Sequence, residues 1–102
     1  MNKLYRKGYY YELKAKQLLL SEGYLVWRSP GSKSPIDIIA INDKGFVRLI
    51  QVKSHENIKK EELEALKELA NKFLFIPNIE VELWIFKKGQ KIEYNKKALL
   101  NL

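Results

Sequence analysis

Two runs rich in β-branched residues, joined by a turn, constrain this chain more than any other feature. The runs are residues 36–41 (IDIIAI) and 46–53 (FVRLIQVK), and residues 42–45 (NDKG) separate them. β-Branched residues favour strands, and a short Asn-, Asp- and Gly-rich segment between two such runs is typical of a hairpin. The sequence therefore predicts an antiparallel strand pair in the middle of the chain.

Helical and strand periodicities alternate along the rest of the sequence. The predicted order is α-β-β-β-α-β, with a further β-strand left open at the end, which indicates an α/β fold: a mixed β-sheet flanked by helices. With 102 residues, we expect a single domain over 1–102. The predicted helices span 4–22 and 59–74; the other predicted strands span 24–29 and 79–87, and 91–95 is the further one.

Composition excludes several classes of site. The chain has no cysteine and one histidine, so disulfides, thiolate zinc sites, iron–sulfur clusters and His-rich metal sites are ruled out. No apolar run reaches the roughly 18 residues of a membrane span, and no G-x-G-x-x-G follows the first strand. We therefore expect a cytoplasmic protein without a membrane segment or nucleotide cofactor. Nineteen Lys and Arg against 12 Asp and Glu give a net charge of +7, which favours a polyanionic partner such as nucleic acid.

Polar residues interrupt both strands of the predicted hairpin. Asp37 lies in an otherwise apolar run, where a carboxylate is costly to bury unless it is paired or holds a cation. Gln51 and Lys53 flank Val52, so their side chains share one face of the return strand. If residues 43–45 form a three-residue loop with Gly45 in the left-handed conformation, Asp37 lies opposite Gln51. An acid, an amide and an ammonium group would then meet on one face of the sheet.

Glu12 is the candidate fourth member of this group. It lies one helical turn after Gly8, where the missing side chain allows close approach. Two carboxylates, an amide oxygen and a lysine suit a hard cation such as Mg²⁺, with Mn²⁺ as a substitute. Such a site can polarise a phosphodiester and generate a hydroxide nucleophile, so the residue types predict phosphodiester hydrolysis.

Residues 5–54 resemble the archaeal Holliday-junction resolvases of the PD-(D/E)xK nuclease superfamily. The matching motifs are the opening R-K-G, the helix glutamate, the R-S-x-G-S loop, the x-D of one strand and the V-K-S end of the next. The resemblance implies a restriction-endonuclease-like core and a Mg²⁺-dependent endonuclease that cleaves four-way DNA junctions in recombination and repair. It also implies a homodimer, because symmetric cleavage needs two sites, and products with 5′-phosphate and 3′-hydroxyl ends.

The resemblance also assigns roles to residues. Glu12, Asp37 and Gln51 are the implied metal ligands, and Lys53 serves the attacking water; these four are the predicted catalytic residues. The family usually has Glu at the position of Gln51, although other superfamily members use Gln, so we expect metal binding weaker by about 1–3 kcal/mol. Residues expected to contact DNA phosphates are Arg6, Lys7, Arg28, Ser29, Ser32 and Lys33.

Other interpretations of the same residues stay open. Asp37 and Lys53 could form a structural ion pair, and Glu12 could pair with Lys16 one turn later. The protein could bind branched DNA without cleaving it, with Gln51 as the mark of a degraded site, or it could cut flaps or ends. We expect both tryptophans in the core and the acidic helix 59–74 to face away from the nucleic acid.

Overall fold

The computed structural model describes residues 3–29 and 34–102, and within residues 3–7 it describes the backbone alone. Five strands form one mixed sheet in the order β1-β2-β3-β4-β5, in which β3 and β4 are parallel and the other pairs are antiparallel. The predicted fold class is confirmed, the further strand is present, and a short last helix was not predicted. The elements are α1 (Lys3–Ser21), β1 (Leu25–Arg28), β2 (Ile38–Ile41), β3 (Val47–Lys53), α2 (Lys60–Lys72), β4 (Ile79–Lys87), β5 (Gln90–Tyr94) and α3 (Lys96–Leu100).

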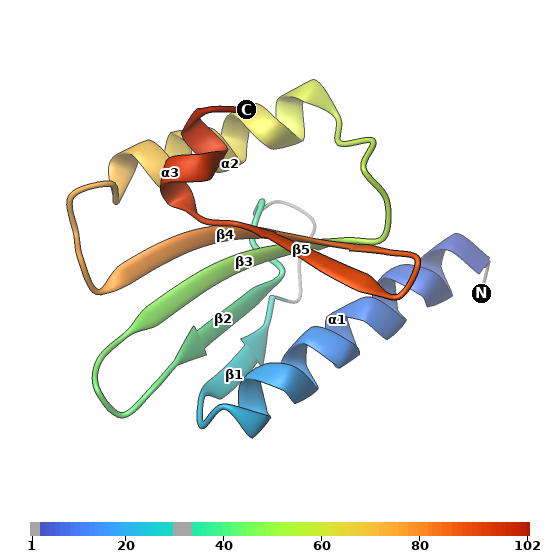
Figure 1. The fold of residues 1–102 in the computed structure, drawn as a ribbon, viewed down its shortest axis with the longest axis horizontal. Helices are drawn as coiled ribbons and strands as arrows, with labels where there is room; N and C mark the ends of the chain where they lie inside the picture. Colours follow the sequence, from blue (N-terminus) through green and yellow to red (C-terminus); the bar gives the residue numbers. More distant parts are fainter. Residues whose placement is uncertain (1–2, 30–33) are drawn as a thin grey trace.

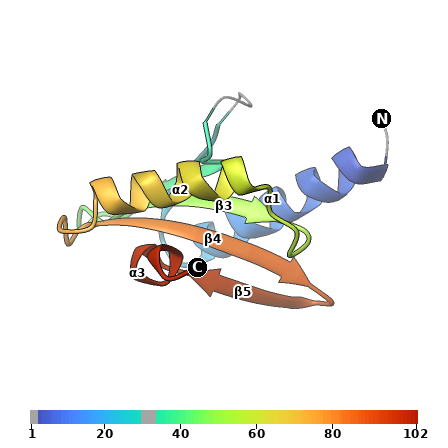
Figure 2. The ribbon, with the colours of Figure 1, turned by 90° about the horizontal axis from the view of Figure 1, so that it is seen from above.

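Helices cover both faces of the sheet (Figure 1). Apolar residues of α1, among them Ala15 and Leu19, pack on one face against alternate residues of β2, β3 and β4. On the other face, Leu66 and Ala70 of α2 pack with α3 against the intervening residues of β4. In the view from above (Figure 2), α2 runs along β4, and α3, which contacts α2, is seen almost end-on. Two core layers thus hold the sheet, as expected for strands whose faces are both apolar.

The hairpin between β2 and β3 has the predicted register. Ile38 lies opposite Ile50 and Ile41 opposite Val47. Gly45 adopts a φ of 84°, the left-handed conformation that the three-residue loop requires. The Asn42 side chain closes the turn by accepting hydrogen bonds from the backbone N–H groups of Lys44 and Phe46, each at 3.0 Å. This register carries Asp37, one residue before β2, to the end of β3 that holds Gln51.

The tryptophans have opposite environments, and the expectation for one of them was wrong. Trp84 in β4 is 1% exposed, as predicted for a core residue, whereas Trp27 in β1 is 53% exposed. β1 is an edge strand, and α2 packs over β4 and leaves the side of β1 that carries Trp27 uncovered. Across the described ranges, the structure has no helix with the length and hydrophobicity that a membrane crossing needs.

Candidate active site

A cleft of about 430 Å³ lies where α1, the end of β3 and the first turn of α2 meet. The segment that leads into β2 also lines this cleft. The four predicted catalytic residues, Glu12, Asp37, Gln51 and Lys53, all line this cleft, although they come from three separate segments of the chain. The hairpin register aligns Asp37 with the end of β3, and α1 brings Glu12 to the same place.

Asp37 is held by the backbone rather than by a cation. Its Oδ2 accepts a hydrogen bond from the Val52 N–H at 2.8 Å. Burial raises the pKa of the Asp37 carboxyl above its usual value, and this hydrogen bond and the positive charge of Lys53 offset only part of the rise. The proposed ion pair between Asp37 and Lys53 is wrong, because Lys53 Nζ instead lies 2.6 Å from Glu62 Oε2.

Glu12 faces Arg28 across the cleft wall. Arg28 Nη2 lies 3.7 Å from Glu12 Oε2, so the partner of this carboxylate comes from β1 and not from Lys16 on its own helix. Burial and the negative charge of Asp37 raise the pKa of Glu12, and Arg28 counteracts them in part. The two carboxylates are therefore close enough to repel each other, which is the arrangement that a shared cation would relieve.

Gln51 has a buried oxygen without a protein partner. Its side chain is 6% exposed, and Oε1 accepts no hydrogen bond within the part of the chain that the structure describes. A buried acceptor left unsatisfied costs roughly 1–3 kcal/mol. Amide and carboxylate oxygens are the ligands of Mg²⁺ and Ca²⁺, so this oxygen together with Glu12 and Asp37 fits a hard divalent cation. Over residues 8–29 and 34–102, no three Asp, Glu, His or Cys side chains are grouped to hold a metal, so the candidate ligand set consists of two carboxylates and the amide.

Glu62 is the site residue that sequence reasoning missed. The helix that carries it was expected to face away from the substrate, yet Glu61 and Glu62 of its first turn both line the cleft. A glutamate in an acidic helix looks solvated in the sequence, because nothing marks which turn packs beside a strand end. The only signal was the position of Glu62 at the start of a helix that follows β3 directly.

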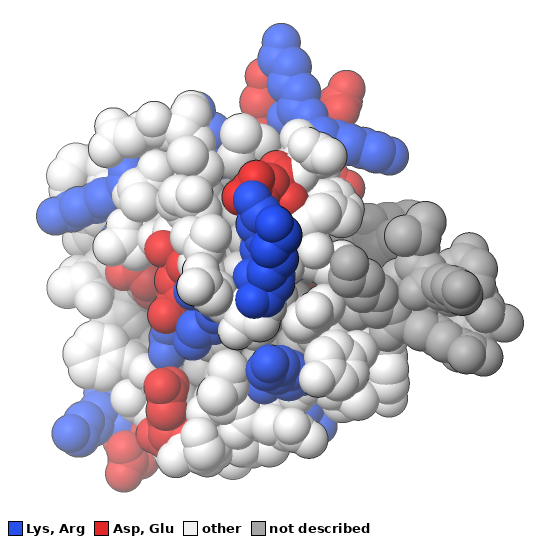
Figure 3. All heavy atoms as spheres, turned by 45° about the vertical axis from the view of Figure 1, so that its right-hand side comes forward, with Lys and Arg blue, Asp and Glu red and all other residues white. Residues whose placement is uncertain are grey.

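The predicted DNA contacts are only partly described. Arg28 stacks over the Tyr9 ring at 4.6 Å from its centroid, and the Ser29 N–H donates to the Asp37 carbonyl at 2.8 Å. Ser32, Lys33 and the side chains of Arg6 and Lys7 lie outside the described residues. Figure 3 shows the end of the molecule where β3 finishes: over its described part, basic, acidic and uncharged side chains alternate. The phosphate-contacting surface thus stays a prediction.

A mixed sheet that gathers two carboxylates, an amide and a lysine in one cleft places the chain in the PD-(D/E)xK nuclease superfamily, as the motifs predicted. The family model described as archaeal Holliday junction resolvase matches residues 3–99. The chain belongs to this family.

Individual relatives agree with this assignment. The crossover junction endodeoxyribonuclease Hjc of Methanocaldococcus jannaschii is 41% identical over 70 residues, which are 65% of this chain. The match spans about half of that relative, 51% of its length. The solved structure of Hjc from Archaeoglobus fulgidus, a Holliday junction resolvase, is similar in fold with a TM-score of 0.67 at 22% identity, over 89% of this chain and 74% of that one.

Proposed function

We propose that this protein is a metal-dependent endonuclease that hydrolyses phosphodiesters in four-way DNA junctions. The observation that carries the proposal is the convergence of Glu12, Asp37, Gln51 and Lys53 in one cleft. Two features support it further: the unpartnered oxygen of Gln51, and the raised pKa values of two neighbouring carboxyls. Membership in the resolvase family and the crossover junction endodeoxyribonuclease of Methanocaldococcus jannaschii among its relatives support the choice of substrate.

Each residue has a defined task in this proposal. Glu12, Asp37 and Gln51 would hold one or two Mg²⁺ ions, for which Mn²⁺ could substitute. The bound metal would polarise the scissile phosphate and lower the pKa of a water molecule. Lys53 orients that water and balances negative charge on the phosphate, while Val52 fixes the Asp37 carboxylate through its backbone N–H. Residues for phosphate contact are Arg6, Lys7, Arg28, Ser29, Ser32 and Lys33.

The assembly follows from the geometry of the substrate. A four-way junction has two equivalent strands to cut, so symmetric resolution needs two active sites. We therefore propose a homodimer, with residues 1–102 of each copy forming one nuclease domain that acts in the cytoplasm. The exposed side chains of Leu25 and Trp27 on the edge strand β1 are the candidate apolar contacts between copies.

A second candidate is a structure-selective DNA-binding protein without catalysis. The observation that favours it is Gln51 itself, since a neutral amide binds a divalent cation less strongly than a carboxylate does. This candidate predicts junction binding that is equally tight with and without a chelator, whereas the nuclease requires the metal for cleavage.

The test is cleavage of labelled four-way junction, flap and linear duplex with Mg²⁺, Mn²⁺ or EDTA. We expect junction-selective cuts that require a metal and that are lost in Asp37→Ala and Lys53→Ala. Matched controls are Asp43→Ala and Lys44→Ala, two exposed residues of the turn before β3, which should cleave like the wild type. No cleavage with either metal, together with tight junction binding by both active-site variants, would leave the binding protein. Preferred cutting of flaps would redirect the substrate assignment.

A further inference from the structure

Glu62 stands out among the acidic residues of α2. Its Oε2 lies 2.6 Å from Lys53 Nζ, and its side chain is 36% exposed, so the pair lies at the cleft rather than in open solvent. Glu61, its neighbour in the first helical turn, also lines the cleft but forms no ion pair within the described residues. Both glutamates suit the helix N-terminus equally well, so the helix dipole does not explain why one of them holds the lysine.

The ion pair between Lys53 and Glu62 changes the net charge of the cleft. Glu12 and Asp37 supply two negative charges, Gln51 supplies none, and Lys53 and the adjacent Arg28 each add a positive charge. With Glu61, which also lines the cleft, these formal charges leave a single negative charge, which attracts a divalent cation only weakly. Glu62 adds a second negative charge by neutralising Lys53, and so supplies the charge that a glutamate at position 51 would have given.

Two further observations connect Glu62 with the ligand group. The charge of Glu62 contributes to the raised pKa of Asp37, so the two carboxylates interact electrostatically across the cleft. Gln51 lines the same cleft, and its buried Oε1 has no partner among the described residues, which points to a ligand that the carboxylates and the amide would share. An ion placed there would be influenced by Glu62 without contacting it.

We propose that Glu62 is a positioning residue that compensates for the carboxylate missing at position 51: by holding Lys53, it restores the negative charge that the cleft needs to bind a divalent cation. This inference rests on the proposed metal-dependent function. Glu62 of α2 would thus supply the third carboxylate of the site, in place of a glutamate at position 51 of β3.

The test measures Mn²⁺ binding to the DNA-free protein by isothermal titration calorimetry. We expect Glu62→Gln to weaken Mn²⁺ binding at least fivefold, because the substitution removes the charge and keeps the side-chain shape. The matched control is Glu64→Gln, on the same helix but exposed and outside the cleft lining, which should change the affinity less than twofold. Thermal unfolding of each variant without metal checks that the fold is retained.

A rescue experiment distinguishes charge compensation from a general effect on the helix. In the Glu62→Gln background, Gln51→Glu should restore the Mn²⁺ affinity to within twofold of the wild type. Equal affinities of Glu62→Gln and the wild type, or a failure of Gln51→Glu to restore binding, would overturn this inference and leave the proposed nuclease intact. A wild-type protein that binds no Mn²⁺ would overturn the metal-dependent function itself, and the inference with it.

Discussion

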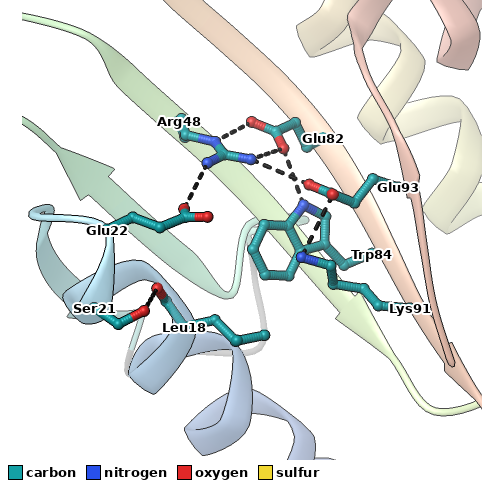
Figure 4. A network of polar contacts seen from close by, with 8 residues as sticks. All are labelled: Leu18, Ser21, Glu22, Arg48, Glu82, Trp84, Lys91 and Glu93. Atoms are coloured by element: carbon teal, nitrogen blue, oxygen red, sulfur yellow. Dashed lines mark hydrogen bonds and ion pairs between the residues drawn. The ribbon is translucent and has the colours of Figure 1, made fainter. Parts of the chain in front are cut away.

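Buried polar groups have hydrogen-bond partners at the start of β3 but lack one at its other end. At the start of the strand, Arg48 donates to both carboxylate oxygens of Glu82 at 2.7 Å, and it also contacts Glu93 at 3.2 Å and Glu22 at 3.6 Å (Figure 4). Trp84 Nε1 donates to the same Glu82 at 2.9 Å. At the other end of the strand, Gln51 keeps a buried oxygen that no described residue satisfies.

The pKa shifts at the two ends show the same contrast: charges are stabilised at one end and destabilised at the other. Its hydrogen bonds with Glu82 raise the pKa of Arg48 further above its usual range, so this pair stabilises its own charges. Burial raises the pKa values of Glu12 and Asp37, so these two carboxylates oppose folding when they are ionised. We call the paired groups around Arg48 the completed end of β3 and the groups around Gln51 the unsatisfied end. The energetic cost of the unsatisfied end lies at the site where a bound ligand would remove it.

The largest effect should come from breaking the completed end. Arg48→Met leaves the Glu82 carboxylate, 4% exposed, without its bidentate partner, so we expect a loss of about 3–5 kcal/mol in the free energy of unfolding. Urea denaturation measures this loss. Glu22→Gln, which removes the outermost and exposed partner of Arg48, should cost less than about 0.5 kcal/mol. A loss below about 1 kcal/mol for Arg48→Met would remove the contrast between the two ends.

A buried lysine secures the same end of the sheet. Lys96 is 6% exposed, and its Nζ donates to the carbonyls of Phe73, Ile76 and Ile79 at 2.7–2.8 Å. Lys96→Met should lower the free energy of unfolding by about 2–3 kcal/mol, because three carbonyls lose a charged donor. Denaturation of the exposed neighbour variant Lys97→Met, expected within about 0.5 kcal/mol of the wild type, is the control. Equal stabilities of the two variants would contradict this role.

At the unsatisfied end, removing a charge should stabilise the protein. Asp37→Asn keeps an acceptor for the Val52 N–H and removes the buried charge, so we expect a gain of about 1 kcal/mol at pH 7 in EDTA. Because folding raises the pKa of Asp37, ionisation destabilises the fold at high pH. The gain should therefore shrink as the pH falls through the raised pKa, where the wild-type carboxyl becomes neutral.

Denaturation from pH 3 to pH 8 follows this trend, with Asp43→Asn as the exposed control that should show no such dependence. A variant less stable than the wild type at pH 7 would mean that the carboxylate contributes to the fold and is not a cost of the site.

The smallest effect concerns the turn that aligns the two strands. Gly45→Ala should cost about 1 kcal/mol, because alanine is strained at a φ of 84° and no neighbouring atom lies close enough to add a clash. Gly8→Ala in α1, where the backbone is helical, should instead stabilise the protein by about 0.5–1 kcal/mol. Thermal unfolding of both variants tests this opposition of sign, and a stabilising Gly45→Ala would contradict it.

Local chemistry made most of this fold predictable. The NDKG turn determined the hairpin register and hence the alignment of Asp37 with Gln51. The long apolar strand β4 was placed to the residue. The helix α3 was missed because five residues carry too little periodicity, and the exposure of Trp27 was missed because an edge strand looks like a central one in the sequence.

The site was predictable to the extent that its residues lie on paired strands. Gln51 and Lys53 share a face by alternation, and the turn brings Asp37 to them. Glu62 could not be placed, because its approach to Lys53 depends on how the first turn of α2 packs against the end of β3. The pairing of Arg28 with Glu12 likewise depends on the docking of α1 against β1.

The opposite environments of the two tryptophans give the molecule separate optical reporters. Trp84 lies in the Arg48 network beneath Lys91, whose Nζ is 4.1 Å from the ring centroid, so its emission should be blue-shifted and shielded from iodide. Trp27 is 53% exposed on the edge strand β1, so its emission should be quenched readily in a monomer and shielded in the proposed dimer. In Trp27→Phe the remaining fluorescence follows unfolding of the core around Arg48, which the Trp84 ring contacts, whereas in Trp84→Phe it follows what covers the edge strand β1.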